Sequence, residues 1–279
     1  MPIHDQGYRR YAGQRTPAGR AWIVIARTGV RTLLSRRAFI GLLLVAWLPF
    51  LVRAVQMYLA ANLPQAAVLL PTALTFRQFL AQQEVFLFFI TVYAGSGLVA
   101  NDRRVNALQI YLSKPLTRVE YIFGKFVVLA TFLLLVTWVP AVALLLVQIL
   151  FSGSFSFFLG NPQLLPAITL FSIIQVVTIS TAMLALSSLS KNARYVAFLY
   201  AALIFFSQAM VVVMFLVTRS RFLWISMPNN LQLVGDVIFG VKTIRLETSV
   251  FPPFLMLFLL VCASLAILER RVRAVEVVQ

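Results

Sequence analysis

Long apolar runs, separated by short polar segments, dominate the pattern of this sequence. A helix that crosses a bilayer needs about 20 consecutive, mostly apolar residues. Six runs meet that requirement, and none alternates with the period of a strand. The pattern therefore predicts an all-α membrane protein with six transmembrane helices, at about 38–58, 79–100, 122–150, 166–189, 195–217 and 250–268.

Two segments outside these runs also have helical periodicity. In residues 21–34 the apolar positions share one face, while Arg20, Arg27 and Arg31 mark another. A basic, amphipathic helix suits a membrane surface, so we expect an N-terminal interfacial helix; the alternative is an extension of the first span. In residues 218–249, Asn229 or Asn230 can cap a short surface or re-entrant helix that ends at Gly240.

Small residues form a stripe on the fourth predicted span, at spacings of three and four. Such a stripe lets two helices approach closely. It fits either a face toward another subunit or ordinary packing inside one subunit. The stripe consists of Thr178, Thr181, Ala185 and Ser188.

Charge fixes the predicted orientation. The chain of 279 residues is 61% hydrophobic, has a mean hydropathy of +0.92 and carries a net charge of +16. If both termini lie in the cytoplasm, 17 Lys and Arg residues fall inside and five outside. This bias follows the positive-inside rule, which explains the net positive charge without a nucleic-acid partner. We expect one transmembrane domain over 1–279: a cytoplasmic tail with the interfacial helix (1–37), a six-span bundle (38–268) and a cytoplasmic tail (269–279).

The sequence carries no recognisable catalytic chemistry. No Gly-x-x-x-x-Gly-Lys-Ser/Thr motif occurs, so a P-loop nucleotide site is excluded, and the eight acidic residues are scattered. One histidine, His4, and one cysteine, Cys262, cannot form a His/Cys metal cluster. We therefore expect no enzymatic activity and no cofactor or metal in this chain. Cys262 lies in an apolar run, which favours a buried thiol.

The stretch from Gly95 to Lys125 is a charged island between the second and third spans. Residues 101–112 can form a short helix, which Pro115 would end because proline lacks an N–H and disfavours helix before it. Thr117 can then cap a new helix, with Glu120 three residues later as in a capping box. The pattern predicts a helix, a break and a second helix just outside the bilayer.

This stretch resembles the loop between the second and third spans of type-2 ABC exporter permeases. The matching motifs are a small-residue run, an acidic residue, Leu-Ser-(Arg/Lys)-Pro-Leu-(Ser/Thr)-Arg and Tyr-x-x-Gly-Lys. Many relatives have Gly-Thr where this chain has Asn106-Ala107. The corresponding residues here are Gly95-Ser96-Gly97, Asp102, Leu112 to Arg118, and Tyr121 to Lys125.

The resemblance implies a half-permease in the inner (cytoplasmic) membrane. A second permease subunit, identical or not, would complete the pathway, and separate ABC ATPase subunits would bind ATP and Mg. The short helix would be a coupling helix that docks the ATPase. The residues that would serve this coupling are Asn101, Asp102, Arg103, Arg104, Val105, Leu108, Leu112, Ser113, Lys114 and Pro115.

Two ionisable residues, Arg53 and Glu84, fall inside the first and second spans at matched depth. Intramembrane charges are usually functional and paired, so we predict an ion pair or a shared wet pocket. The alternative is that Arg53 extends to the outer interface and Glu84 is hydrated.

Three other functions compete with an ABC permease. A secondary transporter or channel would be favoured by an internal repeat, which the loops do not support. A membrane-embedded enzyme needs clustered polar residues at one depth. A membrane assembly protein would lack an ATPase partner.

The topology can be tested by labelling single cysteines. In a Cys262→Ser background, Lys242→Cys should react with an impermeant maleimide from the outside, because residues 218–249 are expected there. Labelling from the cytoplasmic side alone would contradict the six-span topology.

Overall fold

The computed structural model describes residues 20–63, 65, 71–107, 116–153, 155–219, 222–241 and 251–272, and these are helical with short connections. Six helices are long and apolar enough to cross a membrane, as the sequence predicts, so the chain is a multi-pass membrane protein. They cover Arg37–Asn62, Ala73–Arg104, Arg118–Ser152, Leu164–Leu189, Ala193–Thr218 and Phe251–Arg271.

Three of these long helices are interrupted within their length. The first consists of α2 (Arg37–Ala46) and α3 (Leu48–Asn62). The third consists of α8 (Arg118–Val136) and α9 (Trp138–Ser152), and it breaks at Thr137. Pro140 has no N–H to bond the carbonyl four residues earlier, which explains a break at this place.

The second long helix has the most segments. It consists of α4 (Ala73–Gln82), α5 (Glu84–Ile90), a π-helical turn η2 (Thr91–Gly95) and α6 (Gly97–Arg104). It begins six residues before the predicted start at Phe79, and this difference brings Arg77 inside the helix.

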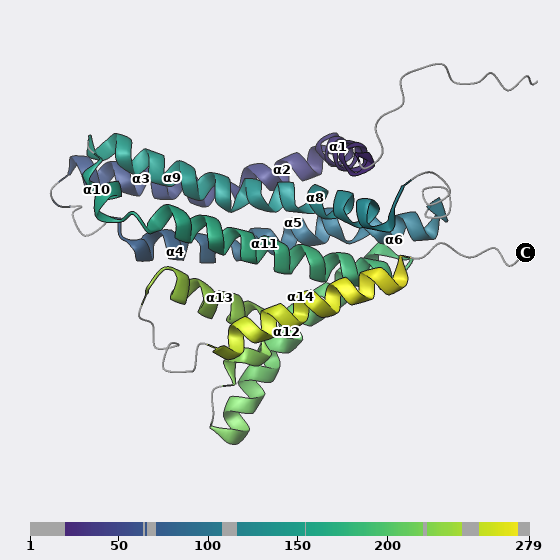
Figure 1. Cartoon of the computed structure of the whole chain (residues 1–279). Coiled ribbons are helices and arrows are strands. Elements are labelled where there is room, and N and C mark those ends of the chain that lie inside the picture. The colour runs from purple at the N-terminus through teal and green to yellow at the C-terminus, as the bar shows by residue number, and fades with distance from the viewer. Residues whose placement is uncertain are drawn as a thin grey trace, which may run out of the picture.

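The helix α11 (Leu164–Leu189) lies at the centre of the bundle, with α8, α9, α6 and α14 (Phe251–Arg271) packed around it (Figure 1). Most of its residues are buried, among them Thr178, Thr181, Ala185 and Ser188. The small-residue stripe therefore serves ordinary packing inside one subunit, and it does not form a face toward another subunit.

The helix α12 (Ala193–Thr218) is the least enclosed of the long helices. It leaves the bundle at an angle (Figure 1), and only Val196, Tyr200 and Val211 are buried along it. Cys262, expected to be buried, is exposed on α14. Both surfaces are apolar, and in a membrane protein an apolar exposed face is suited to lipid or to another subunit.

Between α12 and α14 the chain forms a single 3-10 turn η3 (Leu223–Ile225) and the helix α13 (Met227–Ile238). The expected short helix is thus present, and Gly240, with φ of 64°, follows its end. The predicted cap was wrong: the Ser226 hydroxyl, not Asn229 or Asn230, accepts a hydrogen bond from the Asn229 N–H, at 3.5 Å. A serine is one of the best caps, and it leaves both asparagine side chains to bond elsewhere.

The N-terminal helix α1 (Ala21–Leu34) lies across the bundle and packs on α8 (Figure 1). Arg20, Arg27 and Arg31 are exposed, as the periodicity predicts. Glycine permits the close crossing: a Cβ on Gly124 would lie 2.9 Å from Ile25 Cβ and 3.0 Å from the Trp22 carbonyl oxygen. The short helix α10 (Ser156–Gly160) lies at the opposite end of the bundle.

The crossing of α1 and α8 can be tested by adding one methyl group. Gly124→Ala should destabilise the protein by about 1–3 kcal/mol, because the backbone of α1 cannot move aside without losing contacts. Gly41→Ala is the matched control, since nothing lies within 4 Å of its Cβ. It should be neutral or stabilise α2 by up to about 1 kcal/mol. Thermal unfolding in detergent measures both, and equal melting temperatures for the two variants would contradict the tight crossing.

Candidate functional site

Polar contacts gather where α6 ends and α8 begins, which we call the loop end of the bundle. Asp102, in the last turn of α6, accepts hydrogen bonds at its Oδ2 from Lys125 Nζ at 2.7 Å and from the Tyr121 hydroxyl at 2.7 Å. Both partners lie on α8, and Tyr121 is fully buried. Asp102 therefore fixes the end of the second long helix to the start of the third.

A serine fixes α6 to α11 as well. The Ser187 hydroxyl accepts from the N–H groups of Val99 (3.1 Å) and Ala100 (3.0 Å) and donates to the Ser96 carbonyl (2.8 Å). The π-helical turn η2 directly precedes these residues, and a π turn disturbs the regular ladder of backbone hydrogen bonds. Ser187 thus bonds backbone groups of α6 beside the irregularity, from another helix.

The same end of α11 accepts a charged hydrogen bond. The Arg103 guanidinium donates from Nη1 to the carbonyl of Ser188, one residue before α11 ends. The last carbonyls of a helix have no partner within it, and a cation there complements the helix dipole. Asp102 and Arg103, adjacent in sequence, therefore join α6 to two different helices.

The start of α8 agrees with the sequence prediction. The Thr117 hydroxyl accepts from the Glu120 N–H at 3.2 Å, and the Glu120 carboxylate accepts from the Thr117 N–H at 3.0 Å. This is the predicted capping box, and it gives the helix after the loop a rigid beginning.

The predicted single helix over residues 101–112 was wrong. Asn101, Asp102, Arg103 and Arg104 are the last turn of α6, and the chain turns at Val105 and Asn106, where Asn106 has φ of 54°. Asparagine tolerates this left-handed conformation better than most residues, so the helix can end there. Five predicted coupling residues lie outside the described residues: Leu108, Leu112, Ser113, Lys114 and Pro115.

A buried ion pair lies farther along the bundle, and the sequence did not predict it. Arg77 Nε on α4 lies 2.9 Å from Asp236 Oδ1 on α13, and the two side chains are 4% and 7% exposed. Arg77 Nη2 also donates to the Gln232 carbonyl at 2.8 Å. The guanidinium lies over the Phe171 ring, 5.1 Å from its centre, and directly against Gly235.

The predicted pair of Arg53 and Glu84 has other partners in the structure. Arg53 Nη1 donates to Gln56 Oε1 at 3.3 Å, and Glu84 Oε2 accepts from Gln232 Nε2 at 3.0 Å. Arg53 lines a cavity with Gln56 and Gln82, whereas Glu84 lines a different one. The Arg53–Glu84 pairing stays a prediction.

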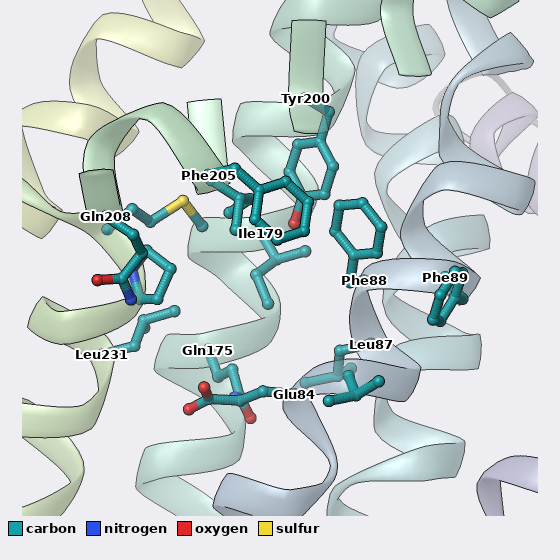
Figure 2. A pocket seen from close by; sticks show the side chains of 14 residues that line it. Glu84, Leu87, Phe88, Phe89, Gln175, Ile179, Tyr200, Phe205, Gln208 and Leu231 are labelled. Atoms are coloured by element: carbon teal, nitrogen blue, oxygen red, sulfur yellow. The ribbon is translucent and has the colours of Figure 1, made fainter. Parts of the chain in front are cut away.

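The cavity that Glu84 lines has a volume of about 440 Å³ and lies between α5, α11, α12 and α13. Figure 2 shows Glu84 and Gln175 together at one end, and Phe88, Tyr200 and Phe205 around the other. Gln208 lies to one side, and its Oε1 accepts from Asn229 Nδ2 at 3.1 Å. A concave, mostly apolar site with a few polar groups is the usual form of a ligand pocket.

Among the described residues, no group of three or more His, Cys, Asp and Glu side chains is placed to hold a metal ion. No protein-family model matches the sequence, and comparison with curated proteins finds no similar one.

A double-mutant cycle tests whether Arg77 and Asp236 act as a pair. Either Arg77→Met or Asp236→Leu alone should cost about 3–5 kcal/mol of stability, because one charge stays buried without its partner. The double variant should cost much less than the sum of the two. Chemical unfolding in detergent measures the four proteins. Arg270→Met, which changes an exposed arginine at the end of α14, is the control and should combine additively with Asp236→Leu.

Proposed function

We propose that this chain is the membrane-spanning permease subunit of an ATP-driven ABC exporter. Two permease subunits would form the translocation pathway, and separate ATPase subunits would bind ATP and Mg. The protein would lie in the cell's inner (cytoplasmic) membrane with both termini and the loop end in the cytoplasm. The motifs between Gly95 and Lys125, and six helices of spanning length, support this proposal.

The observation that carries the proposal is the set of contacts at the last turn of α6. Asp102 bonds Lys125 and Tyr121 on α8. On α11, the Ser188 carbonyl accepts a hydrogen bond from Arg103, and the Ser187 hydroxyl accepts one from the N–H of Val99. A movement of the segment that follows α6 would therefore move three long helices together. A coupling element needs this property, because it transmits a displacement without supplying chemistry.

The exposed side of α12 fits the need for a second permease subunit. Its large apolar side chains are exposed along most of its length, including Phe198, Phe206 and Val217. Helices associate in membranes through packing, so such a surface can serve a dimer as well as lipid.

Introducing a negative charge into the loop tests the coupling. Leu108→Asp and Leu112→Asp should leave membrane insertion intact, abolish co-purification with an ATPase subunit encoded nearby, and reduce ATP-dependent transport at least about tenfold. The reason is that a carboxylate in an apolar docking surface must be desolvated without a partner.

The control for this experiment is Leu159→Asp, which changes a leucine that is 74% exposed on α10, at the opposite end of the bundle. It should preserve complex formation. If both loop variants assemble and transport normally, the loop is a membrane anchor and the proposal is wrong.

A further inference from the structure

The cavity beside Glu84 has features of a site for a ligand of defined chemistry. Its lining comes from four helices: residues from α5 meet residues from α11, α12 and α13, which come much later in the chain. Glu84 and Gln175 lie at one end, and Phe88, Tyr200 and Phe205 lie around the other (Figure 2). A ligand that matches this distribution has one polar group and one apolar body.

Gln175 is the strongest indication of a missing partner at the polar end. Its side chain is fully buried, and neither the amide oxygen nor the amide nitrogen has a hydrogen-bond partner among the described residues. Burying an amide without hydrogen bonds is costly, and native proteins rarely retain such a group without a reason. A ligand at the Glu84 end would meet this amide.

The charges around the polar end favour a cation. Glu84 is the only charged side chain among the described residues that line the cavity. Behind it, Gln232 links two polar contacts, since its side chain donates to Glu84 and its carbonyl accepts from Arg77. Arg77 is itself paired with Asp236. When all three groups are ionised, this cluster carries two negative charges and one positive charge.

The aromatic end suits the organic part of such a cation. The Phe88 ring stacks on Tyr200 with 5.8 Å between ring centres, and Phe205 meets Phe88 edge-on at 5.6 Å. Aromatic faces attract cations, and more strongly where water is excluded. Ca²⁺ and Mg²⁺ fit poorly, because they take six or more oxygen ligands, and this end offers few. A phosphate headgroup would need a basic residue in the lining, and Glu84 would repel it.

We propose that the cavity binds a monovalent organic cation whose apolar body has the size of an aromatic ring system. The Glu84 carboxylate would face the positive charge, Gln175 would bond to the polar group, and Phe88, Tyr200 and Phe205 would enclose the body. The volume of about 440 Å³ lies within the usual range of 300–1,000 Å³ for small-molecule pockets. That this ligand is also the exported substrate rests on the proposed function, whereas its binding does not.

Binding of radiolabelled 2-(2-naphthyl)ethylammonium to the full-length protein, in nanodiscs of neutral phosphatidylcholine, tests this site, because its ammonium group can donate to the Gln175 amide oxygen. The wild type should bind it saturably. 2-Naphthylacetate has a similar shape and the opposite charge, and it should show no saturable binding above empty nanodiscs. Glu84→Gln should weaken binding of the cation about tenfold or more, since it removes the carboxylate from a poorly hydrated site.

Two variants separate binding from folding. Gln175→Leu should weaken cation binding while it leaves the melting temperature unchanged or higher, because the buried amide is replaced by an apolar side chain of similar size. Glu269→Gln, which changes an exposed acid near the end of α14, should leave binding unchanged. Should Glu84→Gln fail to fold, Gln175→Leu and the comparison of the two ions decide the question.

Several results would overturn the site: no saturable binding by the wild type, equal binding of both ions, or unchanged binding by Gln175→Leu. The first two would indicate a cavity filled by lipid chains. A permease that assembles with its ATPase but does not bind the cation would refute the site and leave the proposed function standing. Cation binding without ATPase assembly would refute the proposed function and leave the site standing.

Discussion

A buried polar group has no water to bond, so burying it is costly unless it finds a partner within the protein or in a ligand. This constraint explains where the helices of this chain are fixed to one another. At the loop end, Ser187 bonds backbone groups of α6 beside a π-helical turn, and Asp102 bonds two side chains of α8. Apolar contacts cover most of the remaining helix surfaces. Such contacts are non-directional, so they do not by themselves specify how two helices are oriented. The hydrogen bonds therefore decide the relative positions of α6, α8 and α11.

A second group of polar contacts lies at the junction of α4, α11 and α13. The Arg77–Asp236 pair joins α4 to α13, and the guanidinium covers Phe171 of α11. Breaking one partner of a buried pair is costly, so the pair holds α13 against the bundle. Gln232 extends the same group of contacts to Glu84. Three walls of the cavity, from α5, α11 and α13, are therefore fixed by directed contacts.

The parts of the fold that depend on local patterns were predictable from the sequence. Six apolar runs predicted the six long helices, and the spacing of Thr117 and Glu120 predicted a capping box that the structure contains. The contacts between distant residues were not predictable. Arg77 and Asp236 are 159 residues apart, and Arg77 appeared to lie in a loop because the apolar run begins only after it. The one signal of this pair in the sequence was Asp236, the single acidic residue of α13. Nothing in the sequence distinguished Ser187 from the other small residues on α11.

The fourth wall of the cavity has one directed contact among those described, the hydrogen bond from Asn229 on α13 to Gln208. This wall comes from α12, which has three buried side chains along its length and leaves the bundle at an angle (Figure 1). Segments with few buried contacts open at the lowest free-energy cost. Tyr200, buried on the Phe88 ring, lies in the first third of α12, whereas Phe205 is more exposed and lies farther along. A rotation of α12 that moved Phe205 and Gln208 away from Phe88 and Glu84 would break the hydrogen bond between Gln208 and Asn229. The polar contacts that join α6, α8 and α11 do not involve α12. Under the proposed function, the least enclosed wall of the cavity is therefore distinct from the three helices that receive the movement of the ATPase.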